Sequence, residues 1–174
     1  MQGEEELMNI PKVIHYCWFG KGKMPNLAEK CIESWKKYCP DYEIIEWNED
    51  NYDIQAAPLF VRQAHEAKKW AFVTDYVRLY AMSNRGGIYM DTDVELVSPL
   101  DKFLHHRAFS GFESINAVPT GVMACEKGFP LFSQLLKYYD NVHFYNDDGS
   151  LNTTTNVVTI TNDQLEKGLI LNNK

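Results

Sequence analysis

The sequence predicts an α/β fold with parallel strand pairing. One observation is an opening strand, helix, strand series over residues 12–47, and another is a long helical pattern that leads through Gly86-Gly87 into a short apolar strand. The chain has 174 residues and 45% hydrophobic content, which suits one soluble domain with a sizeable core. We therefore expect residues 1–174 to form a single domain.

The first strand is expected over Lys12 to Phe19, a β-rich run (KVIHYCWF) that ends in the Gly/Lys loop from Gly20 to Pro25. A helix should follow from Asn26, a candidate N-cap residue, and should stop at Pro40-Asp41. Its apolar residues recur at helical spacing: Leu27, Cys31, Trp35 and Tyr38.

Tyr42 to Trp47 (YEIIEW) is expected to form the second strand, followed by the polar loop Asn48 to Asp53. The connection between the two strands is long enough for a right-handed crossover, which implies parallel pairing.

One helix is expected from about Pro58 to Asn84, with Trp70, Val73, Val77 and Tyr80 on one stripe. Gly86-Gly87 should end it in a left-handed conformation. Ile88-Tyr89-Met90 is then a short apolar strand with Asp91-Thr92-Asp93 at its carboxyl end, and Val94 to Val97 should continue in extended form.

The remaining pattern is shorter and more mixed. We expect a short helix from Ser98 to Leu104, strands over Ala108 to Phe112 and Gly121 to Cys125, a helix from Phe129 to Tyr139, and a Thr/Asn-rich loop, Asn152 to Asn156, that caps a helix running to Gly168.

The net charge of -7 argues against a nucleic-acid partner, because affinity for a phosphate backbone depends on clustered Lys and Arg. A nucleotide can still bind an acidic protein when a divalent metal supplies the local positive charge. No apolar stretch is long enough to span a bilayer, and Met1 to Glu6 is acidic where a secretory signal is basic. We expect a cytoplasmic protein without an integral membrane segment, with room for peripheral association at the inner face of a membrane.

The four cysteines indicate a reducing compartment. Cys17, Cys31, Cys39 and Cys125 form no CxxC pair and are unevenly spaced, which is typical of buried free thiols. Cys31 and Cys39 are eight residues apart around a predicted helix, so a direct bridge between them is geometrically unfavourable.

Asp91 and Asp93 are the candidate metal ligands. On an extended segment, residues i and i+2 point to the same side, so both carboxylates would face one site at the end of a buried strand. Mg²⁺ and Mn²⁺ prefer carboxylate oxygen, and ligands of open α/β sheets bind at the carboxyl ends of strands. A solvated acidic turn is the alternative, which the preceding apolar run and Gly86-Gly87 disfavour.

Asp75 and Arg78 stand three residues apart on the preceding helix and share a face, so they can reach the same site or form an ordinary intrahelical ion pair. Trp18, at the end of the first strand, can cover the face of a base, with a core tryptophan as the alternative. We interpret His15 as structural and His105-His106 as an exposed turn, because a metal held by oxygen ligands does not need them.

Three blocks together resemble glycosyltransferase family 32: IPKVIHYCWFG (Ile10 to Gly20), SWKKYCPDYEIIEWNEDNYDI (Ser34 to Ile54) and AFVTDYVRLYAMSNRGGIYMDTDVEL (Ala71 to Leu96). That family includes bacterial capsular-polysaccharide transferases and the yeast initiating α-1,6-mannosyltransferase, and it is related to the glucosylating domains of clostridial toxins. The resemblance implies a GT-A fold, a Rossmann-like mixed sheet flanked by helices. It also implies a nucleotide-sugar donor, Mn²⁺ or Mg²⁺, a saccharide or other hydroxyl acceptor, and retention at the anomeric carbon.

The resemblance also assigns roles to individual positions. Asp93 matches a direct metal ligand, and Asp91 an acid near the ribose and metal. Asp75 and Arg78 match a helix pair that contacts the donor sugar and phosphates. The aromatic residues expected at the donor are Trp18, which stacks on the base, with Tyr16 and Tyr89 beside the nucleotide. In catalysis, leaving-group stabilisation by the metal and Arg78 would be the main effect.

Two alternatives remain open at this point. Family members usually carry a His and a Ser-Trp element near the carboxyl end, which this chain does not have before Lys174. We therefore expect a domain lacking the carboxyl-terminal element, and a non-catalytic nucleotide- or metal-binding domain is one alternative. A phosphatase of the haloacid dehalogenase type is the other, but its motif requires Thr or Val at position 95, which is Glu here.

Overall fold

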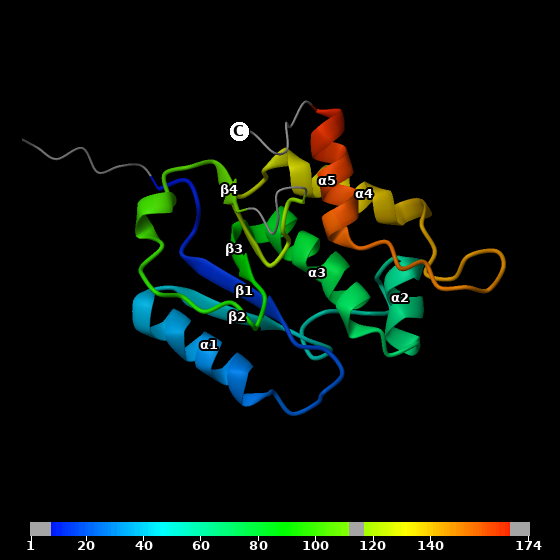
Figure 1. The fold of residues 1–174 in the computed structure, drawn as a ribbon, viewed down its shortest axis with the longest axis horizontal. Helices are drawn as coiled ribbons and strands as arrows, with labels where there is room; N and C mark the ends of the chain where they lie inside the picture. The colour runs from blue at the N-terminus through cyan, green and yellow to red at the C-terminus, as the bar shows by residue number, and fades with distance from the viewer. Residues whose placement is uncertain (1–7, 112–116, 168–174) are drawn as a thin grey trace, which may run out of the picture.

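The computed structural model describes residues 8–111 and 117–167. In this part of the chain, five strands form one mixed sheet in the order β2-β1-β3-β5-β4 (Figure 1). The strands are β1 (Val13–Cys17), β2 (Glu43–Trp47), β3 (Gly87–Met90), β4 (Ala108–Ser110) and β5 (Val122–Cys125). The helices are α1 (Asn26–Tyr38), α2 (Leu59–Glu66), α3 (Trp70–Arg85), α4 (Pro130–Tyr138) and α5 (Asn156–Glu166), with 3-10 turns η1 (Asp101–Phe103) and η2 (Tyr139–Asn141).

The predicted parallel unit is confirmed. β1 pairs in parallel with β2 on one side and with β3 on the other, whereas β5 runs antiparallel to both β3 and β4. The carboxyl ends of β1 and β3 therefore lie side by side at one edge of the sheet, which is where an open α/β sheet binds ligands.

Alternation along the strands divides the core into two clusters. Ile14 and Ile88 belong to the cluster under α1, whereas Cys17 and Tyr89 belong to the cluster shared with α2, α3, α4 and α5. Figure 1 shows α1 on one side of the sheet and the other helices on the opposite side.

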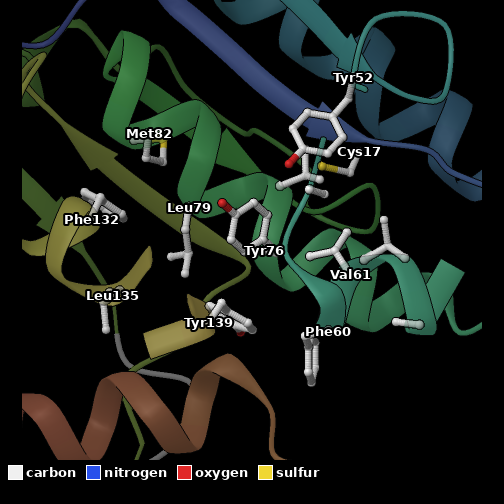
Figure 2. Close-up of a cluster of buried hydrophobic side chains, with 14 of the residues drawn as sticks. Cys17, Tyr52, Phe60, Val61, Tyr76, Leu79, Met82, Phe132, Leu135 and Tyr139 are labelled. Carbon is white, nitrogen blue, oxygen red and sulfur yellow. The ribbon is translucent and has the colours of Figure 1, made fainter. Parts of the chain in front are cut away.

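The larger cluster surrounds α3. In Figure 2, Tyr76, Leu79 and Met82 of α3 lie among Phe60 of α2, Phe132 of α4 and other apolar side chains. Because α3 packs between the sheet and the helices beyond it, it is buried around most of its circumference. Its two charged residues, Asp75 and Arg78, are buried with it and need polar partners.

The prediction of one continuous helix over residues 58–84 is wrong, because two helices, α2 and α3, occupy this stretch. They are separated at Ala67 to Lys69, where Lys68 has a φ of 55°. The break contains neither Gly nor Pro, so the local sequence did not indicate it. Asn26 is the first residue of α1 and not its N-cap, since the preceding position is Pro25 and no side chain caps the helix.

The extended segment expected at Val94 to Val97 does not form a strand. The Trp35 indole N–H donates to the Val94 carbonyl at 2.8 Å, and the Leu96 N–H donates to the Ser34 hydroxyl at 2.9 Å. Side chains of α1 therefore provide the hydrogen bonds that a neighbouring strand would otherwise supply.

The later elements mostly match the expectation. β5, α4 and α5 form as predicted, β4 ends at Ser110, and only Asp101–Phe103 of the expected helix at Ser98 to Leu104 is helical, as a 3-10 turn. Phe112 and Gly168, the expected ends of a strand and a helix, lie outside the described residues. None of the helices in the described ranges is long and apolar enough to cross a bilayer.

Candidate active site

A cavity of about 480 Å³ opens where the carboxyl ends of β1 and β3 meet the start of α3. Its lining includes Trp18, Trp70, Arg78, Asp91 and Asp93, so it brings together aromatic, cationic and acidic side chains. A separate cavity of about 310 Å³ lies between the β4-β5 hairpin and α4 and α5, and no titratable side chain among the described residues lines it. Of these two cavities, only the first is lined by charged side chains.

Asp91 is held at the end of β3 by both its backbone and its side chain. Its N–H donates to the Gly121 carbonyl at 2.8 Å, and its Oδ1 accepts the Tyr89 hydroxyl at 2.9 Å. The same Oδ1 lies 3.4 Å from Nη2 of Arg78. A Cβ at position 121 would lie 3.2 Å from Oδ2, so Gly121 allows the carboxylate to approach the backbone closely.

The Asp91-Thr92-Asp93 segment is a turn and not an extended strand. The expectation that both carboxylates face one site because they are two residues apart on a strand is therefore wrong in its reason. The Val94 N–H donates to the Asp91 carbonyl at 3.0 Å, as in a β-turn. The turn nevertheless places Asp91 and Asp93 on the wall of one cavity. Asp93 is exposed, and among the described residues no side chain hydrogen-bonds to it or forms an ion pair with it.

Arg78 is the buried cation of the site, with its side chain only 7% exposed. Its Nη1 donates to the Thr120 carbonyl at 2.9 Å, and Nη2 lies 3.4 Å from a carboxylate oxygen of both Asp75 and Asp91. The guanidinium also lies over the Tyr89 ring, 4.8 Å from its centroid. The intrahelical pair with Asp75 therefore forms, and Arg78 reaches the cavity as well.

Asp75 lies behind Arg78 and is absent from the cavity lining. Burial raises the pKa of its carboxyl, against the opposing effects of Arg78 and of a hydrogen bond from the Asn156 backbone N–H. Asp75 therefore contacts the Arg78 guanidinium but does not reach the surface of the cavity.

Of the three aromatic residues expected at the donor, two line the cavity, and one of these, Trp18, also packs against the cluster under α1. Trp18 and Tyr89 line the cavity, and the Trp18 indole N–H donates to the Gly22 carbonyl at 2.8 Å. Tyr16 does not line it: strand alternation turns this side chain toward α1, where its hydroxyl donates to Glu46 at 2.6 Å. The structure therefore separates Tyr16 from the other residues predicted to bind the donor.

Trp70 is a cavity residue that the sequence interpretation placed only on a core stripe. Its indole packs against Gly20 so closely that a Cβ at position 20 would lie 2.5 Å from the ring. The Gly20 N–H also donates to Glu49 at 2.7 Å, which fixes the loop after β1. The sequence signal for this contact was Gly20, the glycine directly after the first strand. Residue spacing could not show that Trp70 packs against it.

The residues interpreted as structural behave accordingly. His15 is fully buried, accepts the Trp47 indole N–H at Nδ1 and pairs through Nε2 with the Gly86 carbonyl at 2.9 Å. This pattern requires the neutral ring, and burial lowers the pKa of His15 to about 4. His105 and His106 are exposed, and all four cysteines are free and buried, as predicted.

Comparison with known proteins connects this site to a family. Residues 25–110 match the family described as a glycosyltransferase sugar-binding region containing the DXD motif. The chain is 31% identical over 146 residues to inositol phosphoceramide mannosyltransferase 3 of Schizosaccharomyces pombe, covering 78% of this chain and 40% of that protein. It is 28% identical over 134 residues to mannosyl phosphorylinositol ceramide synthase CSH1 of Saccharomyces cerevisiae, covering 74% of this chain and 35% of that protein. The chain thus spans well under half the length of these relatives.

The fold is similar to that of a solved structure, PaToxG glycosyltransferase. The TM-score is 0.60 with 21% sequence identity, over 74% of this chain and 59% of that one. This likeness confirms the expected mixed α/β sheet flanked by helices, of the GT-A type.

Proposed function

Residues 25–110 belong to the DXD-containing glycosyltransferase family, and from this premise we propose that the protein transfers a sugar from a nucleotide-sugar donor to a saccharide or other hydroxyl acceptor. The observation that carries the proposal is the shared cavity. The DXD turn, the buried Arg78 and the Trp18 indole all line it, at the edge of the sheet where α/β proteins bind nucleotides.

The charges of the site suit a divalent metal. Asp75, Asp91 and Asp93 are three carboxylates against the single cation Arg78, so a doubly charged ion would balance the cluster. In the described part of the chain, no group of three His, Cys, Asp or Glu side chains is arranged to hold a metal. Two carboxylates suffice for Mg²⁺ or Mn²⁺, because substrate phosphates and water complete the coordination. We assign Asp93 and Asp91 as the ligands.

The other side chains of the cavity have separate roles in binding the donor and stabilising the leaving group. Arg78 is fixed on three sides, so it provides a preorganised positive charge where a departing nucleoside diphosphate becomes negative. A bound divalent ion would supply further neutralisation of the same charge. Trp18 offers an apolar ring to the base, and Trp70 adds a second indole to the cavity wall. Tyr89 orients Asp91 through its hydroxyl.

The names of the relatives and the family resemblance support the choice of donor and acceptor to test. Two of the relatives are named as an inositol phosphoceramide mannosyltransferase and a mannosyl phosphorylinositol ceramide synthase, so GDP- and UDP-linked hexoses, mannose first, are the donors to test. The resemblance to capsular-polysaccharide transferases makes saccharides of surface polymers the first acceptor class. We propose retention at the anomeric carbon on the same resemblance.

Metal-dependent nucleotide binding is the first test. Mn²⁺ with a nucleoside diphosphate at 100 times its dissociation constant should stabilise the protein by about 2.7 kcal/mol, or roughly 5–10 °C in Tm. Asp93→Ala should abolish this increase. Glu95→Ala, which changes an exposed acid outside the cavity, should retain it. Equal stabilisation of Asp93→Ala and wild type would remove Asp93 as a ligand.

Turnover separates an enzyme from a binding domain. Wild type should hydrolyse or transfer the sugar of one nucleotide sugar in the presence of Mn²⁺, and Asp93→Ala should not. Binding without turnover on any donor would contradict the proposed activity and support a binding role.

A further inference from the structure

The start of α5 is attached to the helix that carries the buried cation. Asn156, the first residue of α5, is 1% exposed, and its backbone N–H donates to Oδ2 of Asp75 at 3.1 Å. Its side-chain amide donates to the Asp75 backbone carbonyl and accepts the Tyr139 hydroxyl at 2.6 Å. Three hydrogen bonds thus hold this one residue between α3 and the end of α4.

The same carboxylate continues the connection into the cavity. Oδ2 of Asp75 faces Asn156, whereas Oδ1 lies 3.4 Å from Nη2 of Arg78. That Nη2 is in turn 3.4 Å from Asp91 of the DXD turn. A continuous series of polar contacts therefore runs from Asn156 through Asp75 and Arg78 to Asp91.

The chemistry of the contacts explains why an amide stands at position 156. A neutral amide donates from its nitrogen and accepts at its oxygen, and here each end meets a fixed buried partner. An apolar side chain would leave the Asp75 carbonyl and the Tyr139 hydroxyl without this partner in a buried region. A carboxylate would add a negative charge next to Asp75.

The position of the Arg78 guanidinium is only loosely fixed by the two carboxylates, because both contacts, at 3.4 Å each, are longer than ordinary hydrogen bonds. Only the bond to Thr120, at 2.9 Å, is short. The orientation of the Asp75 carboxylate therefore decides how the guanidinium is shared between Asp75 and Asp91. The Asn156 backbone N–H holds that carboxylate, and the Asn156 side-chain amide fixes this N–H in place through its bonds with the Asp75 carbonyl and the Tyr139 hydroxyl.

We infer that Asn156 is a positioning residue for Arg78, acting through Asp75, so that α5, outside the matched family region, controls the cation of the transfer site. The inference rests on the proposed function. Arg78 acts on charge that develops in the transition state, so misplacing it should lower kcat more than it raises KM for the donor.

Kinetics of donor hydrolysis test this inference. Asn156→Ala should lower kcat by about 10- to 100-fold and change KM by less than about 2-fold, since small displacements of a catalytic group have effects of this size. Thr159→Ala, a half-buried position on the same helix whose hydroxyl donates to the Thr155 carbonyl of the first turn, should match wild type. Tyr139→Phe removes only the hydroxyl that donates to the Asn156 side chain, so it should also lower kcat. This variant keeps the test available if Asn156→Ala does not fold.

A double variant distinguishes positioning from general damage. In an Arg78→Lys background, adding Asn156→Ala should change kcat by less than about 2-fold, because the group that it positions is already replaced. The same fold-loss in both backgrounds would overturn the inference, and so would an unchanged kcat in Asn156→Ala.

A measurement without turnover decides the matter if no nucleotide sugar is hydrolysed, which would be a failure of the proposed function alone. The Nε–Hε resonance of Arg78 can be assigned by its loss in Arg78→Lys. Asn156→Ala and Tyr139→Phe should shift this resonance, and Thr159→Ala should not. An unchanged resonance in the first two variants, or an equal shift in all three, would overturn the inference.

Discussion

Replacing Arg78 with methionine should strongly destabilise the protein at neutral pH. The Arg78 and Asp75 side chains are only 7% and 10% exposed, so the substitution leaves a buried carboxylate without its cation. Methionine retains much of the apolar volume of the arginine stem, which keeps the packing contribution of the change small. The variant therefore isolates the electrostatic role of Arg78.

The size of the effect follows from the lost contacts. Breaking a buried ion pair by removing one partner costs about 3–5 kcal/mol. The carbonyl of Thr120, a residue that is 6% exposed, also loses its donor, which adds about 1–3 kcal/mol. A domain of this length loses roughly 2–4 °C in Tm per kcal/mol, so we expect a decrease of at least about 8 °C.

The loss of stability in Arg78→Met should depend on pH, and the pKa of Asp75 determines in which direction. Burial raises the pKa of Asp75 and Arg78 lowers it, so this pKa must rise further in Arg78→Met. A carboxyl whose folded-state pKa lies above its unfolded value loses its contribution to stability as the pH rises through the folded-state pKa. The difference in unfolding free energy between Arg78→Met and wild type should therefore be smaller at pH 5 than at pH 7.

Urea unfolding followed by circular dichroism at both pH values measures this difference. The double variant Arg78→Met/Asp75→Asn should recover part of the stability and lose the added pH dependence, because it carries no buried charge at these positions. A loss below about 1 kcal/mol that is equal at pH 5 and pH 7 would refute the reasoning.

Three further predictions concern the scaffold. The pKa of His15 is lowered to about 4, so its stabilisation is complete above about pH 6.5 and is lost as the pH falls toward 4; His15→Gln should flatten the urea-unfolding profile over that range, and an unaltered profile would contradict this. All four cysteines are buried and burial raises their pKa values, so a thiol reagent should label none in the native protein at pH 7 and four after unfolding. Gly86 has a φ of 66° and a Cβ there would lie 2.6 Å from the Lys127 backbone nitrogen, so Gly86→Ala should cost more than about 2 kcal/mol in chemical denaturation, whereas Gly22→Ala, which meets open space, should cost less than about 0.5 kcal/mol.

The sequence alone determined the elements whose signals are local. β-rich runs that end in polar or glycine-containing loops located β1 and β2, helical spacing located α1, and the crossover between the two strands implied their parallel pairing. A short apolar run after Gly86-Gly87 also located β3 and put Asp91 at its carboxyl end. These conclusions hold because each depends on residues within a few positions of one another.

Only the tertiary structure decided which side chains meet. Tyr16 and Trp18 are two residues apart and both pack against the cluster under α1, yet only Trp18, which follows the end of β1 at Cys17, also lines the cavity. The segment that follows the DXD turn, Val94 to Leu96, is held by hydrogen bonds with α1 residues about 60 positions away in sequence.

The contact between Asn156 and Asp75 joins residues 81 positions apart, and neither residue carries a motif that indicates the other. Sequence patterns report which face of an element is apolar, because burial acts on each residue by itself. Partners are selected by the packing of whole helices against the sheet. This is why the DXD carboxylates and the Asp75-Arg78 pair were predictable from spacing, whereas the contacts of that pair with the Thr120 carbonyl and with Asn156 were not.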